Sequence, residues 1–413
     1  YKARFRNSSL IAGAEITGGR LTDTKLGYPD LSGAVIDEDT ITSVPHIENT
    51  TITRQLSFTN GYFLQYEATL GRASVVVGGR FDSYRIRDLE NDDNDKPGNV
   101  FSPRVSLRYE IASYLHGRLS YSKGFRAPQI FDEDLHIETS GSRQVINVND
   151  PELREETSHS FMASLDLNRL VGTVMTGLLV EGFYTRLNDP FVNDIGVPDS
   201  EGRVIYTRKN ADDGAAVKGT NIELKLKPLR VLTLTSGFTL QASSYDDPQE
   251  FNERSFFRSP SAYGFFAADI DITSDLRITS TGSYTGRMLI PYFGPLTDPV
   301  NGELRESDPF FDLGLKASYD IRLNGSTLQL IAGVKNLFNS YQSDFDLGIN
   351  RDPSYIYGPT SPRTVYVGIR IGNLVGDSHA AAAGKPATVT PASDTVRRGF
   401  PGGRGKRGRK GRF

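Results

Sequence analysis

The chain has 413 residues, a formal net charge of −3, no cysteine and no tryptophan. A nearly neutral charge provides no global field for nucleic acid or anionic lipid, so we expect no nucleic-acid partner. Without cysteine there is no disulfide framework and no thiolate metal site. The 41 Gly, 19 Tyr and 23 Phe against three Met favour many strands with glycine-containing turns. No uncharged apolar run approaches about 18 residues, which excludes an ordinary transmembrane helix but not a membrane β-barrel.

Strict alternation of apolar and polar residues predicts β-strands. The clearest case carries Val105, Leu107, Tyr109 and Ile111 on one face and Arg104, Ser106, Arg108 and Glu110 on the other. The pattern predicts fourteen strands, at 3–16, 55–70, 72–87, 102–111, 114–125, 155–168, 172–187, 217–227, 231–244, 260–272, 275–290, 309–321, 326–338 and 362–373. Most are long enough to supply the roughly 9–11 residues that cross a bilayer.

The connections between these strands alternate between short and long. Short turns are predicted near Gly71, Ala112, 168–172, 228–230, 273–275 and 324–325, and long loops at 17–54, 88–101, 126–154, 188–216, 245–259, 291–308 and 339–361. This sorting predicts an all-β fold, a transmembrane antiparallel up-and-down β-barrel, with apolar residues facing lipid and charged residues facing the lumen. The alternative, a soluble all-β sandwich, has no reason to sort its loop lengths.

Residues 375–413 form a different kind of sequence, with alanine repeats, a Pro/Thr/Ser stretch and a basic end. The lack of periodicity predicts a disordered tail behind a barrel segment at 1–374. Counting strands places this tail in the periplasm. Its basic end suits contact with anionic lipid, peptidoglycan or nucleic acid, and the plainer interpretation is a solvated extension.

Several motifs resemble those of TonB-dependent outer-membrane receptors. They are YSKGFRAP at 121–128, NDPELREETS at 149–158, FSPR at 101–104, VKNLFN at 334–339, YGP at 357–359 and PRTVYVG at 362–368. The motifs stand in the family's order over residues 70–374. Glu155 departs from the pattern, because the family often has proline there. The variant at 129–136 is similar to receptors from Bacteroidota.

The resemblance implies a 22-stranded barrel with an N-terminal plug domain in the lumen. About fourteen strands and no plug are predicted here, so we expect the plug, its TonB-contacting box and about eight strands to precede Tyr1, in a longer receptor or a split gene. The implied function is import across the cell outer membrane of a bulky scarce nutrient, a ferric siderophore or other metal chelate, or else cobalamin. The implied partners are outer-membrane lipid, TonB–ExbB–ExbD acting through the plug, and a surface lipoprotein.

Two other functions remain open at this point. One is a non-transporting binding or scaffold component of a split assembly, and the other is an ungated porin. Enzymatic patterns are poor, because the five histidines are scattered without metal spacing and no nucleophile elbow or phosphate-binding loop is present. We therefore expect no enzyme and no catalytic residue.

Candidate ligand contacts lie in the long loops, where aromatic and charged residues mix. They are Phe131, Asp132, Glu133, Asp134 and His136 in one loop, Tyr292 and Phe293 in another, and Tyr341, Arg351 and Tyr355 in the last. Such a set suits a ligand with flat and polar parts, although the same aromatics also suit packing of loop against loop. No cofactor is required. Oxygen-rich side chains at Asp88, Glu90, Asp92, Asp93 and Asp95 suit Ca²⁺ in an outer loop, or simple solvation.

Overall fold

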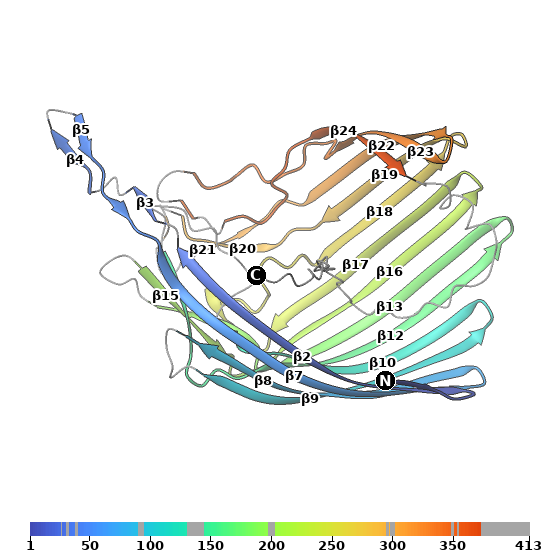
Figure 1. Cartoon of the computed structure of the whole chain (residues 1–413), viewed down its shortest axis with the longest axis horizontal. Coiled ribbons are helices and arrows are strands. Elements are labelled where there is room, and N and C mark those ends of the chain that lie inside the picture. The colour runs from blue at the N-terminus through green and yellow to red at the C-terminus, as the bar shows by residue number, and fades with distance from the viewer. Residues whose placement is uncertain are drawn as a thin grey trace, which may run out of the picture.

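A computed structural model of the chain describes residues 1–25, 27–29, 33–37, 40–89, 95–129, 144–196, 203–294, 297, 302–347, 351–352 and 355–372. Fifteen strands form one sheet in which successive strands pair antiparallel (Figure 1). They are β1 (Lys2–Arg4), β2 (Ser8–Lys25), β7 (Thr50–Leu70), β8 (Ala73–Asp88), β9 (Lys96–Ala112), β10 (Leu115–Arg126), β12 (Glu156–Val171), β13 (Val174–Asn188), β16 (Ala215–Leu229), β17 (Leu232–Tyr245), β18 (Ala262–Asp271), β19 (Leu276–Thr285), β22 (Phe310–Leu323), β23 (Ser326–Lys335) and β24 (Thr364–Gly372). The predicted up-and-down antiparallel architecture is confirmed.

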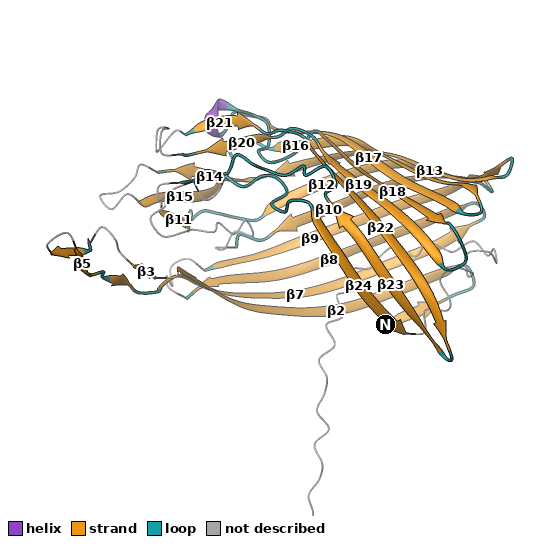
Figure 2. Cartoon of the chain, turned by 90° about the horizontal axis from the view of Figure 1, so that it is seen from above, coloured by secondary structure: helices purple, strands orange, loops and turns teal. Residues whose placement is uncertain are grey.

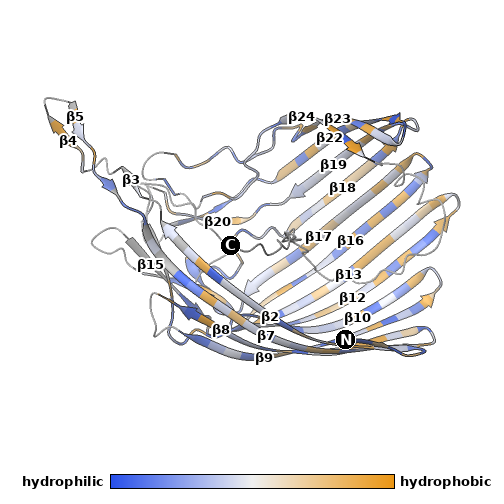
Figure 3. Ribbon diagram, viewed as in Figure 1, coloured by the Kyte–Doolittle hydropathy of each residue, from blue (hydrophilic) through white to orange (hydrophobic). Residues whose placement is uncertain are grey.

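The register gives the sheet one apolar face and one charged face, because directly paired residues point to the same side. Val77, Val105, Tyr121, Phe161 and Tyr184 are successive partners from β8 to β13 and form one row of the apolar face. Figure 3 shows the resulting bands of alternating hydropathy along the strands. On β24, Val367 is 83% exposed, as expected for a wall that faces lipid rather than a protein core.

The opposite face carries the charged side chains predicted for the lumen. Arg80 on β8 donates from Nη1 to Glu15 Oε2 at 2.7 Å, and its Nη2 lies 2.8 Å from Asp82 Oδ1. The Asp82 side chain is almost fully buried under this pair. A buried carboxylate needs such a partner, since an unpaired charge is costly to bury.

Loop lengths alternate as predicted. Short turns follow β1, β7, β9, β12, β16, β18 and β22 and form the turn rim, while the longer connections form the loop rim at the other end of the strands (Figure 1). Gly71 and Gly172 adopt φ of 60° in two of these turns, a conformation that residues with a Cβ disfavour.

The loop rim contains further small elements that periodicity did not predict (Figure 2). They are β3 (Tyr28–Pro29), β4 (Val35–Asp37), β5 (Thr40–Ser43), β6 (His46–Ile47), β11 (Gln144–Asn149), β14 (Phe191–Ile195), β15 (Arg203–Asn210), β20 (Leu289–Tyr292), β21 (Glu303–Glu306) and a 3-10 helix at Glu250–Asn252. β11 pairs parallel with β15, and β14 pairs antiparallel with β15. The β4–β5 hairpin lies beyond the end of the main sheet (Figure 1).

Several predicted boundaries are wrong. The predicted strand 3–16 is a hairpin, β1 and β2, in which Phe5 N donates to Ser8 O, so the sheet has fifteen strands rather than fourteen. The ladder of β2 and β7 reaches Lys25 and Thr50, which shortens the predicted loop at 17–54.

Two other predicted strands are too long. The strand predicted at 275–290 ends at Thr285, and the chain then leaves the main sheet to form β20. The strand predicted at 326–338 ends at Lys335, because Asn336 takes a left-handed φ of 49°.

The two edges of the sheet are β1 and β24, which do not pair with each other in the described part of the chain. Within the same residues, no helix is long and apolar enough to span a membrane. The predicted tail at 375–413 lies outside the described residues, as does the predicted barrel boundary at 374.

Candidate ligand-binding loop rim

The structure describes only some of the predicted ligand contacts. Phe131, Asp132, Glu133, Asp134 and His136 lie outside the described residues, as do Glu90, Asp92 and Asp93 of the predicted Ca²⁺ set. Tyr292, Phe293, Tyr341, Arg351 and Tyr355 are described and belong to two loops at one end of the loop rim. Only this second half of the predicted set lies in the described part of the chain.

Tyr292 and Tyr355 form the centre of a small buried core at the rim. Their ring centroids are 4.7 Å apart in an edge-to-face arrangement. Tyr292 is 8% exposed and Tyr355 is 3% exposed. Together with Met288 and Ile290 they form what we call the tyrosine cluster. Two of the three predicted ligand tyrosines, Tyr292 and Tyr355, thus pack loop against loop.

Arg305 on β21 places its guanidinium over the tyrosine cluster. The Arg305 Cζ atom lies 3.4 Å from the Tyr292 ring centroid and 5.4 Å from the Tyr355 centroid. Its Nε donates to Glu303 Oε1 at 2.5 Å, and 40% of the side chain is still exposed. A cation stacked on aromatic faces is held in one orientation, here with Glu303 paired along one edge of the guanidinium and part of the side chain still exposed to solvent.

Gln342 and Asp344 fix the loop that carries Tyr355, and sequence reasoning missed both. The buried Gln342 donates from Nε2 to Tyr355 O at 3.0 Å and accepts from Tyr357 N at 2.9 Å. Asp344 accepts from the hydroxyls of Tyr355 at 2.9 Å and Tyr357 at 2.7 Å. Burial, reinforced by the hydrogen bond to Asp344, raises the pKa of Tyr357 well above its ordinary value. The only sequence signal is the mixture of amide, acid and aromatic residues at 341–346.

Phe293 connects three loops of the rim. Its backbone N donates to Asp352 Oδ2 at 2.8 Å, which joins the loop after β20 to the last loop. Its ring lies 5.9 Å from that of Phe251, in the loop after β17. Tyr341 and Arg351, from the same predicted set, are half-buried in the last loop.

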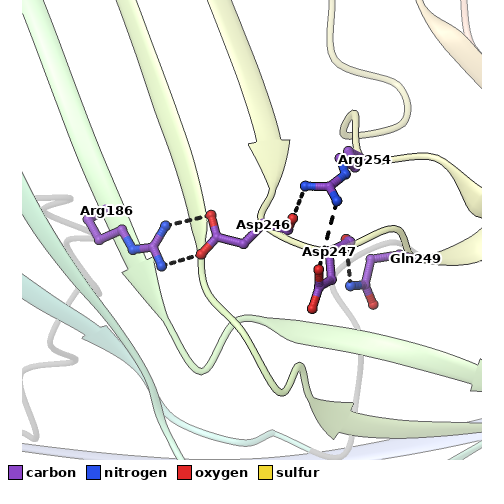
Figure 4. Close-up of polar contacts among 5 residues, drawn as sticks. All are labelled: Arg186, Asp246, Asp247, Gln249 and Arg254. Atoms are coloured by element: carbon purple, nitrogen blue, oxygen red, sulfur yellow. Dashed lines mark hydrogen bonds and ion pairs between the residues drawn. The ribbon is translucent and has the colours of Figure 1, made fainter.

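The loop after β17 is anchored by an ion-pair network (Figure 4). Arg186 on β13 donates from Nη1 to Asp246 Oδ1 at 2.8 Å and from Nη2 to Oδ2. Arg254 donates to Asp246 O, and Gln249 donates to Asp247 O at 3.0 Å. The hydrogen bond from Arg186 lowers the pKa of Asp246, whereas a hydrogen bond with Asp247 raises the pKa of Asp213 beside it.

The predicted Ca²⁺ set has two described members, which lie at the loop rim end of β8 and β9. Asp88 is buried, and Asp95 Oδ2 accepts from Arg85 Nε at 2.7 Å. The arginine neutralises a carboxylate that a cation would need. In the described part of the chain, no group of three or more His, Cys, Asp or Glu residues is placed to hold a metal ion.

The two motif segments at 121–128 and 149–158 pack against the loop rim. Pro128 is fully buried, and Lys96 donates from Nζ to the carbonyls of Asp150, at 2.9 Å, and Pro151. Tyr84 donates from its hydroxyl to Glu155 Oε2 at 2.7 Å. Glu155, the departure from the family pattern, therefore has its own partner in this chain.

A family model described as TonB dependent receptor-like, beta-barrel, matches residues 5–337. No curated protein matches the sequence. Solved structures with a similar fold include the FrpB iron transporter from Neisseria meningitidis, at 15% identity and a TM-score of 0.61 over 89% of this chain and 53% of that one. The copper transporter OprC, at 14% identity and a TM-score of 0.62, is matched over 90% of this chain and 55% of its own.

The siderophore receptor PirA from Acinetobacter baumannii is similar at 17% identity and a TM-score of 0.57, over 90% of this chain and 53% of that one. This chain thus spans about half the length of these structures. Identities this low show the fold alone. The match of the family model over most of the chain agrees with the alternating strands, the two faces and the motifs. The chain belongs to the TonB-dependent receptor β-barrel family, whose members lie in the outer membrane.

Proposed function

We propose that this chain forms wall and outer loops of an outer-membrane receptor that imports a bulky metal chelate, with a ferric siderophore as the first candidate. The observation that carries the proposal is the combination of an apolar outer face with loops packed into an ordered rim around Tyr292 and Tyr355. Solved relatives of the fold are an iron transporter, a copper transporter and a siderophore receptor. Cobalamin is the alternative cargo.

Arg305 is the residue we assign to ligand contact in the described rim. Its side chain is 40% exposed beside the ion pair with Glu303, and the tyrosine rings beneath it hold the guanidinium plane in place. Ferric chelates commonly carry carboxylate, catecholate or hydroxamate oxygens, which suit a planar cation with several donors. Tyr292 and Tyr355 act here as positioning residues, because their rings are buried.

Transport requires energy coupling, which we assign to TonB–ExbB–ExbD acting through a plug domain. In this proposal the charged face, with pairs such as Arg80 with Glu15 and Asp82, faces that plug. The strands cross the outer membrane, the loop rim faces outward and the tail at 375–413 lies in the periplasm. A surface lipoprotein is a candidate second partner. We assign no enzymatic role to the chain.

The test is growth on single nutrient sources. A strain lacking this gene is grown under iron limitation with individual ferric siderophores, and in parallel under cobalamin limitation. We expect loss of growth on one class of ferric chelate and rescue by the intact gene. Loss of growth only under cobalamin limitation would identify cobalamin as the cargo instead. Normal growth on every chelate and on cobalamin would overturn the import function.

Two measurements separate the remaining functions. Rescue that fails in a strain without TonB supports energy-coupled import. Free conductance of small solutes by the purified receptor in planar bilayers would identify an ungated porin instead. Ligand binding without uptake would identify a binding or scaffold component.

A further inference from the structure

A groove of 1150 Å³ lies on the apolar face of the sheet, across β9, β10, β12, β13, β16 and β17. Ala163, Gly182 and Thr220 are successive partners in one row, and these small residues form the floor of the groove. Leu119 pairs with Ala163 and Leu240 pairs with Thr220, so larger apolar side chains close the row at both ends. The groove is therefore a depression in the surface that faces lipid.

The side of the groove nearer the loop rim is aromatic and ends in a cation. Tyr121, Phe161, Tyr184 and Lys218 are successive partners in the next row, and all four line the groove. Phe161 is 51% exposed and Tyr184 is 42% exposed, so both rings are available to an apolar ligand. Lys218 is also exposed.

Further basic residues lie one row closer to the loop rim on the same face. Lys123, His159 and Arg186 are successive partners there, roughly 7 Å above the aromatic row. His159 Nδ1 lies 2.9 Å from the Tyr121 hydroxyl, which confirms that these rows share one face. We call Lys123, His159, Arg186 and Lys218 the basic border.

The basic border has spare positive charge. Arg186 is neutralised by Asp246. In the part of the chain that the structure describes, neither Lys123 nor Lys218 has an ion-pair partner. Unpaired lysines at the edge of a lipid-facing surface extend toward the headgroup layer and favour anionic headgroups.

We propose that this groove binds an acyl chain of an anionic, phosphate-bearing lipid of the outer leaflet, with its headgroup on Lys218 and Lys123. The lining surface is mostly apolar, which suits a hydrocarbon chain better than a sugar or peptide. Among the described residues, the cations that border the groove lie on the side toward the loop rim, where the headgroups of that leaflet are located. The apolar groove thus matches the acyl chain, and the lysines beside it match the phosphate headgroup of the same lipid. This inference needs a membrane-inserted barrel but no particular cargo.

The test is native mass spectrometry of the complete receptor in detergent micelles, titrated with lipid A that retains its phosphates. The same lipid after phosphatase treatment is the second probe. Lys218→Ala and Lys123→Ala should each weaken binding of the phosphorylated lipid about fivefold, the effect of one lysine near an anionic headgroup. Neither substitution should change binding of the dephosphorylated lipid.

The chain offers a matched control on the same strand. Lys225 lies on β16 but on the charged face, paired with Gly177 and Thr235. Lys225→Ala should leave lipid binding unchanged. Equal losses for Lys218→Ala and Lys225→Ala would show non-specific attraction and overturn the site.

A second variant tests the groove itself. A Cβ at Gly182 meets no atom within 4 Å, so Gly182→Leu fills the floor without displacing the backbone. We expect weaker binding of both lipid probes, with heat-modifiable migration of the barrel unchanged. Undiminished lipid binding by Gly182→Leu would overturn the acyl-chain assignment. If the unsubstituted receptor forms dimers and this variant does not, a second copy of the chain is the occupant of the groove instead of a lipid.

Discussion

Arg305 stacks on Tyr292, with the guanidinium carbon 3.4 Å from the ring centroid. The contact joins the two strands of the β20–β21 hairpin on the side that faces Tyr355. A cation over an aromatic ring contributes about 0.5–2 kcal/mol, depending on its exposure. The same contact therefore stabilises the β20–β21 hairpin and holds in place Arg305, the residue that we assign to ligand contact.

Arg305→Ala should loosen the rim and weaken chelate binding together. We expect faster hydrogen exchange at 289–292 and 303–306, and weaker binding of the ferric siderophore that supports growth. Arg305→Lys should restore part of the affinity but less of the stacking, because an ammonium lacks the planar guanidinium. Arg322→Ala, at the turn rim, is the control, and an effect there as large as at Arg305 would contradict the assignment.

Asp246 should make the loop after β17 sensitive to acid. Its pKa is lowered by Arg186, so the stabilisation is present above about pH 4, the ordinary carboxyl value, and is lost as the pH falls through the lowered pKa. Hydrogen exchange at 246–261, corrected for the intrinsic rate, should therefore rise below that pH. Asp246→Asn should show fast exchange already at neutral pH. Asp308→Asn, in another loop, should leave exchange at 246–261 unchanged.

Asp213 should act in the opposite direction. Its pKa is raised by the hydrogen bond with Asp247, so this contact stabilises the loop at low pH and is lost as the pH rises through the raised pKa. Asp213→Asn removes the repulsion between the two carboxylates and should slow exchange around 211–214 at neutral pH. Faster exchange in this variant would show that the charged form of Asp213 is the stabilising one.

Asn336 is the hub of the corner after β23. Its side chain donates to Ser340 O at 3.1 Å and Ser361 O at 3.0 Å, and accepts from Ser340 N at 2.7 Å. Asn336→Gly tolerates the positive φ but loses all three bonds, at a cost of about 1–3 kcal/mol in the free energy of unfolding. Asn339→Gly, which loses one bond to the Arg363 N–H, should cost less, as measured by urea unfolding in detergent.

The two faces of β24 should respond differently to substitution. Val367→Arg places a charge on the lipid face and should destabilise insertion by about 2–4 kcal/mol near the bilayer midplane. Arg370, which pairs with Gln329 on the charged face, should tolerate Arg370→Ala. Comparable amounts of both variants in outer-membrane fractions would contradict the assignment of faces.

The architecture was predictable because successive side chains of a strand point to opposite faces, so a strand with one lipid face has an apolar residue at every second position. The segment from Arg104 to Ile111 follows this alternation without exception. The β1–β2 hairpin was missed, since its turn at 5–7 contains neither glycine nor proline to interrupt the pattern. The rim was only half predictable. Tyr292 and Tyr355 were visible as aromatics in loops, but their burial depends on Gln342 and Asp344, whose partners are set by the packing of distant loops.

The parallel pairing of β11 with β15 has a consequence for redesign. Gln144 pairs with Arg203 and Asn149 with Arg208, so two loops separated by whole strands share one ladder. Their lengths and sequences are therefore interdependent. Exchanging either loop alone with that of a relative would leave a row of backbone amides without acceptors, so new specificity at this part of the rim has to be transplanted as a pair.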